Sequence, residues 1–199
     1  MTPLYPGTCY HIYNHANGDD NLFREVENYR FFLQQYERYI PPVADTYAYC
    51  LMPNHFHLLV RIKEAEMLLP AFPKFQTLEM LEGSNFISKQ FSNLFSSYTQ
   101  AFNKMHGRRG SLFMKNFKRK EIHVDKYFGN AIAYVHLNAI KHGFIKEVGD
   151  WQWTSYHHYL HQQPYQLLNR QPVLEWFGGV ECLKSFHDDY KTGLANMVR

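Results

Sequence analysis

The spacing of apolar residues changes several times along the first half of the chain. A run rich in β-forming residues over 8–15 predicts a strand. Aromatic and aliphatic residues at helical spacing over 27–40 predict a helix, which a Pro-Pro pair ends. A second strand is expected over 45–52. Pro53 and Asn54 would then turn the chain into a third strand, which makes an antiparallel hairpin.

The second half repeats this alternation. Residues 63–84 contain prolines and predict a loop or a broken helix. A long amphipathic helix is expected over 85–105, a strand over 111–122 and another helix over 126–141. The remaining chain predicts a helical cover that ends in a helix near 180–192.

The resulting order, β-α-β-β-α-β-α, favours an α+β fold. We expect a ferredoxin-like (RRM-like) antiparallel sheet with helices packed on one of its faces. Residues 1–160 would form this domain and residues 161–199 a small helical C-terminal extension. A chain of 199 residues with 45% hydrophobic residues is large enough to bury a core of this kind.

The third strand carries the first candidate chemistry. His55 and His57 are separated by Phe56, and successive strand side chains point to opposite faces. The two imidazoles therefore share one face, with their Cα atoms roughly 7 Å apart, and Phe56 anchors the other face in the core. Two imidazoles so placed can converge on one metal ion, although a single strand histidine is more often a half-buried residue without such a role.

The predicted helix over 126–141 adds a phenol and an amide. Tyr134 and Asn138 are four residues apart and share a helix face, with Tyr127 two turns earlier on nearly the same face. Together with the two strand histidines they form a set able to bind a divalent cation and to present a nucleophile. His136 points away from Tyr134 on such a helix, so we do not expect it to join this set.

Charge is distributed unevenly, although the net charge is only +3. No acidic residue lies between Gly83 and Lys120, and aromatic residues are interleaved with the basic ones. This combination indicates a surface that follows a phosphate backbone and stacks on bases. A face that is merely solvated is the less favoured interpretation. The residues that we expect to contact the nucleic acid are Arg108, Arg109, Lys115, Lys118 and Arg119.

Composition excludes several other classes of protein. Three widely spaced cysteines form neither a disulfide framework nor a zinc-knuckle motif, which favours a reducing compartment. We find no signal-peptide pattern and no apolar run near the ~20 residues that a membrane span requires. The protein is expected to be soluble and cytoplasmic, associated with the nucleoid when it binds DNA.

The motifs resemble one known family. His55-Phe56-His57, within Met-Pro-Asn-His-Phe-His-Leu-Leu-Val, resembles the HUH motif of single-tyrosine transposases, most closely the REP-associated tyrosine transposases. The resemblance extends over about residues 5–160. It includes Tyr10-His11-Ile12-Tyr13-Asn14, Tyr98-Thr99-Gln100-Ala101-Phe102-Asn103, the basic segment 108–118, Tyr134-Val135-His136-Leu137-Asn138 and Trp153-Thr154-Ser155-Tyr156.

The resemblance implies a mechanism. His55, His57 and Asn138 would hold the metal, and Tyr134 would attack the scissile phosphate to leave a 5′-phosphotyrosine and a free 3′-hydroxyl. The family implies Mg²⁺ or Mn²⁺, although two imidazoles alone would also suit zinc. The implied partner is single-stranded DNA that folds into a hairpin, and a homodimer is possible.

Two positions depart from the family pattern, and alternatives stay open. Ala139 stands where a proline is common after the asparagine, and His15 stands where an arginine often ends the first strand. Tyr127 is the second candidate nucleophile. We expect His136, which points away from Tyr134, to face solvent or DNA. The competing functions are a catalytically silent module that binds DNA or RNA hairpins, and a metal-dependent phosphodiesterase in which the histidines activate water.

Overall fold

A four-stranded antiparallel sheet forms the centre of the molecule. The computed structural model describes residues 3–71, 85–161 and 165–197. The strands are β1 (Cys9–His15), β2 (Ala44–Met52), β3 (His55–Ile62) and β4 (Lys118–Glu121), in the spatial order β2-β3-β1-β4. This order, with β1 and β3 in the middle, confirms the predicted ferredoxin-like sheet.

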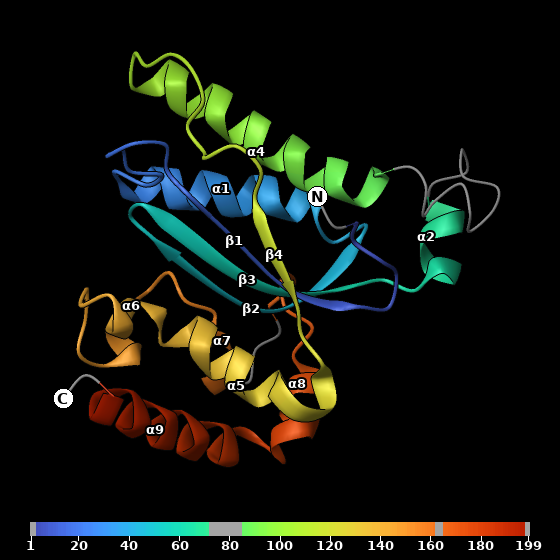
Figure 1. The fold of residues 1–199 in the computed structure, drawn as a ribbon, viewed down its shortest axis with the longest axis vertical. Coiled ribbons are helices and arrows are strands. Elements are labelled where there is room, and N and C mark those ends of the chain that lie inside the picture. Colours follow the sequence, from blue (N-terminus) through green and yellow to red (C-terminus); the bar gives the residue numbers. More distant parts are fainter. Residues whose placement is uncertain (1–2, 72–84, 162–164, 198–199) are drawn as a thin grey trace.

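Helices cover both faces of the sheet (Figure 1). On one side lie α1 (Val26–Tyr39) and α4 (Phe86–Met105), and on the other lie α5 (Val124–His136), α6 (Asn138–Lys141) and the C-terminal helices. The prediction of helices on one face was therefore wrong. The physical reason is visible in β3, where all residues except Arg61 are buried, so both faces of the sheet need a cover.

The remaining elements are short, except for α9. They are α2 (Ala65–Ala71), η1 (Val148–Asp150), α7 (Tyr156–Leu160), α8 (Gln171–Phe177) and α9 (Val180–Met197). The predicted loop or broken helix over 63–84 lies partly outside the described residues. None of the described helices is both long and apolar enough to cross a membrane.

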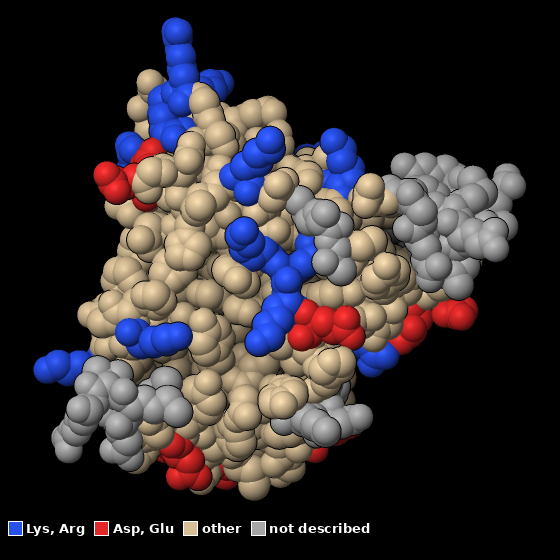
Figure 2. All heavy atoms as spheres, in the orientation of Figure 1, with Lys and Arg blue, Asp and Glu red and all other residues tan. Residues whose placement is uncertain are grey.

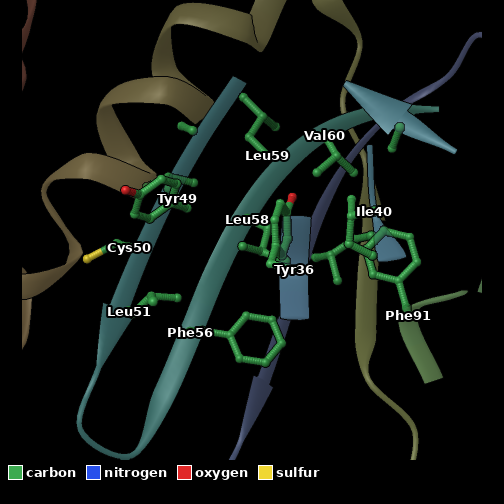
Figure 3. Packing of buried hydrophobic residues seen from close by; sticks show 14 of the residues in the cluster. Tyr36, Ile40, Tyr49, Cys50, Leu51, Phe56, Leu58, Leu59, Val60 and Phe91 are labelled. Atoms are coloured by element: carbon green, nitrogen blue, oxygen red, sulfur yellow. The ribbon is translucent and has the colours of Figure 1, made fainter. Parts of the chain in front are cut away.

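Phe56 points into the main core, as its place between two histidines predicted. Its ring lies 5.6 Å from that of Phe32 on α1 and 5.4 Å from that of Phe95 on α4, measured between centroids. Figure 3 shows Phe56 among the buried side chains of this face. The same strand therefore fixes a core on one face and leaves its two imidazoles on the other.

The strand predicted over 111–122 is mostly irregular, and only β4 at its end is regular. Asn116 has a φ of 64°, which breaks an extended run. Phe113 and Phe117 are drawn into contact with Phe95, at 5.0 and 5.5 Å between centroids. The Met114 N–H still donates to the His15 carbonyl at 2.9 Å, so the pairing with β1 is interrupted around Asn116 and resumes before it.

The helix predicted over 126–141 is split at Leu137 into α5 and α6. The Leu137 N–H still donates to the Ala133 carbonyl at 2.9 Å, so the two helices remain nearly continuous. Gly143, with a φ of 73°, then ends the segment.

The C-terminal helices pack on α5. His136 is fully buried. Both of its ring nitrogens have hydrogen-bond partners: Nδ1 lies 2.9 Å from His187 Nε2 on α9, and Nε2 lies 2.8 Å from Ser155 Oγ. The expectation that His136 faces solvent or DNA was wrong, since α9 covers that side of α5. Part of the predicted extension 161–199, helix α9, thus packs against the helix that carries Tyr134. A domain boundary at residue 160 stays a prediction.

Candidate active site

The pairing of β1 with β3 gathers aromatic and imidazole rings on one face of the sheet. Tyr13 lies opposite His57 and His15 opposite His55. Residues opposite each other on paired strands share a face, and so does His11, two residues before Tyr13. We call these five residues the histidine face.

Hydrogen bonds orient the two predicted metal-binding imidazoles. His55 Nδ1 is 2.7 Å from the side-chain oxygen of Asn54. Because an amide oxygen only accepts, Nδ1 carries the hydrogen and the lone pair is left on His55 Nε2. His57 Nδ1 is 2.7 Å from His11 Nε2, which leaves His57 Nε2 turned away from that bond.

Three buried polar atoms at this site have no hydrogen-bond partner within the described part of the chain. They are His55 Nε2, His57 Nε2 and Asn138 Oδ1, one from each predicted ligand. The Asn138 side chain is held by its Nδ2, which donates to the Tyr134 carbonyl at 2.7 Å. Buried acceptors without partners are costly, and coordination of a divalent cation would give each of them the partner that it lacks. The residues present therefore fit the metal that the family implies.

Burial keeps these imidazoles neutral, which is the form that binds metal. Burial, with a smaller contribution from neighbouring imidazoles, lowers the pKa of His57 to about 2 and that of His55 to about 3. Burial likewise lowers the pKa of His11 to about 4, with Lys120 adding to the effect. Neither His55 nor His57 therefore needs to lose a proton before it coordinates a metal at neutral pH.

The same pKa shifts predict acid sensitivity of the metal-free protein. In the unfolded chain a histidine has a pKa near 6.5, whereas in the folded chain these three stay neutral far below it. As pH falls below about 6.5, the unfolded state therefore binds protons that the folded state does not, and the free energy of unfolding decreases. Urea titrations at pH 7.5 and 5.0 should show this loss, and a smaller loss for His55→Leu. Equal stability at the two pH values would contradict the burial of these rings in neutral form.

Tyr134 meets the histidine face from α5. Its ring stands edge-on to those of His57 and His11, with centroids 5.7 and 5.5 Å apart. Lys141 Nζ lies 4.7 Å from the centre of the Tyr134 ring. Strand imidazoles and helix phenol thus meet within one chain, and no second copy is needed to unite them.

Tyr127 has a different environment. Its side chain is 55% exposed on the first half of α5, and among the described residues no ring contact joins it to the histidine face. The position of Tyr134 therefore makes it the better candidate nucleophile.

Three histidines near the site were given no role from the sequence. His11 hydrogen-bonds His57, His15 stacks on His55 with ring centroids 4.6 Å apart, and the His142 ring is 4.6 Å from that of His55. The alternation of His11 and His15 along the first strand was a usable signal. The strand that faces them, and the register of that pairing, were not visible in the sequence.

The predicted DNA-binding residues differ in their surroundings. Arg109, Lys115 and Lys118 are exposed. Arg119 is half-buried, donates to Ser88 Oγ at 2.9 Å and stacks over the Phe117 ring at 4.2 Å. Figure 2 shows basic side chains over β4 and towards the end of α4.

Arg108 has partners inside the protein. Its guanidinium forms an ion pair with Asp20 and donates to Asn103 Oδ1 at 2.9 Å and to the Ser111 carbonyl at 2.8 Å. These bonds fold the loop after α4, so Arg108 offers less to a phosphate than the other four residues.

A groove of about 1190 Å³ lies between α4 and the segment that leads into β4. Phe95, Phe113 and Phe117 contribute to its lining, together with hydroxyl groups of α4. Lys115 and Arg119 also line it. It therefore combines aromatic surface, hydrogen-bonding groups and positive charge, the combination typical of grooves that bind single strands.

Comparisons with known proteins give a consistent result. No protein-family model matches the chain. A Haemophilus influenzae protein described as a "Putative REP-associated tyrosine transposase" is 28% identical over 116 residues. The resemblance to the REP-associated tyrosine transposases is confirmed. The matched region spans 57% of this chain and 59% of the Haemophilus protein.

A solved structure shares the fold of this chain. It is described as "Structure of the REP associates tyrosine transposase bound to a REP hairpin" and matches with a TM-score of 0.60 at 15% identity. The match covers 85% of this chain and 96% of the other. At this identity it shows the fold alone, and it includes more of this chain than the sequence match does.

Proposed function

We propose that this protein cleaves and rejoins single-stranded DNA in hairpin-forming elements, through a 5′-phosphotyrosine on Tyr134. One observation carries the proposal: the Tyr134 ring lies edge-on to His57, one of three residues whose buried ligand atoms lack hydrogen-bond partners in the described part of the chain. A nucleophile next to a site for a divalent cation is the arrangement that phosphoryl transfer needs.

The roles of the residues follow from their placement. His55, His57 and Asn138 would hold Mg²⁺ or Mn²⁺, which when bound polarises the phosphoryl group and offsets the charge developing on it. The Tyr134 phenol gives up its proton and its oxygen attacks the phosphorus. The bond from phosphorus to O3′ breaks, and the leaving oxygen takes up a proton to become the 3′-hydroxyl. Lys141, over the Tyr134 ring, places positive charge beside the incoming phosphate. One phosphodiester replaces another of similar energy, so rejoining needs no ATP.

Basic residues near β4 would contact the DNA backbone. Arg109, Lys115, Lys118 and Arg119 lie on or before β4, which borders β1 and thus the strand that carries His11. We assign phosphate contacts to these residues. The groove beside α4 would bind the single-stranded DNA that flanks the hairpin. The solved relative is described as bound to a REP hairpin, and hairpins of that kind are the first probes to use.

The decisive experiment is covalent capture. Labelled single-stranded hairpins are incubated with the protein and Mn²⁺, and the products are separated on a denaturing gel. A labelled protein band that requires the metal supports the transposase mechanism. Retention of DNA in a native gel without such a band would favour the binding module, and cleavage without a band would favour the water-activating phosphodiesterase.

Binding is also expected to depend steeply on salt. Each lost phosphate contact should lower the slope of log affinity against log salt by about 0.7 on single-stranded DNA. Replacing Arg109 and Lys118 with alanine should therefore lower the slope by roughly 1.4 and weaken binding to every sequence alike. The control is Lys184→Ala on α9, whose Nζ lies 3.0 Å from Glu181. An unchanged slope in the double variant would remove these residues from the interface.

A further inference from the structure

His142 lies at the same site, although it is not one of the predicted metal ligands. One ring nitrogen each from His55, His57 and His142 lie within 4.8 Å of one another. His55 and His57 are buried, whereas His142 is exposed at the edge of the cluster. A cation there would therefore meet a third imidazole in addition to the two on β3.

The short helix α6 explains how His142 comes to this place. Tyr134, Asn138 and His142 follow one another at intervals of four residues, so they form one stripe along α5 and α6. The His142 N–H donates to the Asn138 carbonyl at 3.0 Å, which keeps the last turn helical up to His142. The stripe thus brings the nucleophile, the amide and this imidazole to the same side, facing the sheet.

A second observation points to a ligand here. His55 Nε2, His57 Nε2 and Asn138 Oδ1 are buried and lack hydrogen-bond partners among the described residues. With a His142 nitrogen they make a donor set of three imidazole nitrogens and one oxygen. Three nitrogens favour borderline transition-metal ions, whereas Mg²⁺ prefers a shell of oxygens.

We propose that His142 is a further protein ligand of this site, and that it makes the site bind zinc-class ions more tightly than Mg²⁺ or Mn²⁺. This inference shares one element with the proposed function, namely that a cation binds between His55, His57 and Asn138. Its basis is the cluster of three imidazoles, which holds whether or not the protein cleaves DNA.

Closing the cluster requires only a small movement. A tetrahedral ion with Zn–N distances of about 2.0–2.1 Å sets its nitrogens roughly 3.4 Å apart, compared with at most 4.8 Å here. His55 is held by Asn54 and by stacking on His15. His142 is exposed at the end of α6, so its side chain supplies the movement.

The test measures binding of the metal alone, without DNA. Zn²⁺ is titrated into the full chain against a coloured chelator, and Co²⁺ is added separately to record the visible bands of a tetrahedral complex. The wild type should bind one Zn²⁺ per chain. His142→Ala should bind it at least about 100-fold more weakly, since even loss of an outer-shell partner costs 10–100-fold, and should lose the tetrahedral Co²⁺ bands. The matched control is His123→Ala, which removes an exposed histidine before α5.

Two results would overturn the proposal. One is Zn²⁺ affinity in His142→Ala equal to that of the wild type, and the other is an equal loss in His123→Ala. Covalent capture with Mn²⁺ is measured on the same preparations, so that failure of the proposed function is scored separately. A protein that forms no adduct but binds Zn²⁺ through His142 still supports this inference.

Discussion

Tyr134→Phe is expected to abolish covalent capture of single-stranded DNA completely. Phenylalanine keeps the ring that stands edge-on to His57 and His11 but lacks the oxygen that would form the phosphotyrosine. Because only a hydroxyl is removed, the fold and DNA binding should be retained. The experiment compares adduct on a denaturing gel with retention of the same hairpin on a native gel.

The matched control is Tyr127→Phe on the same helix. Tyr127 is 55% exposed, and its loss should leave capture close to the wild-type level. Capture that survives Tyr134→Phe and disappears in Tyr127→Phe would reassign the nucleophile. Capture that survives in both variants would exclude a single-tyrosine mechanism at this site.

His55→Leu should separate function from stability. It removes a predicted metal ligand, so Mn²⁺-dependent capture should fall at least about 100-fold, beyond the usual range for an outer-shell partner. Most buried substitutions also destabilise a protein. Here the imidazole carries a buried Nε2 without a hydrogen-bond partner among the described residues, and a leucine removes that unfavourable burial. The partner of its Nδ1, Asn54, is exposed and can bond to water instead.

We therefore expect the metal-free Tm of His55→Leu to lie within about 4 °C of the wild type, since 1 kcal/mol shifts a chain of this size by roughly 2–4 °C. The wild type should gain stability when Mn²⁺ is added, and the variant should not. Thermal melts with and without Mn²⁺ measure both effects. A variant that is still stabilised by Mn²⁺, or that still forms adduct, would show that His55 is not a ligand.

The local patterns of the sequence determined much of the site. Alternation along a strand is enough to place His55 and His57 together and Phe56 opposite them. Helical spacing is likewise enough to align Tyr134 with Asn138. These relations depend only on the geometry of the backbone within one element, so they hold wherever the element packs.

Contacts between distant segments decided the rest. The register of β1 against β3 brings His11 to His57 across 46 residues, and the packing of α5 over the sheet brings Tyr134 to both. Arg108 forms an ion pair with Asp20, 88 residues away in the sequence. A count of basic residues cannot reveal that this arginine is already paired. His136 is buried because α9 covers it. In each case the outcome depends on which surfaces of different elements exclude water together, and that is a property of the whole fold, not of any local stretch of sequence.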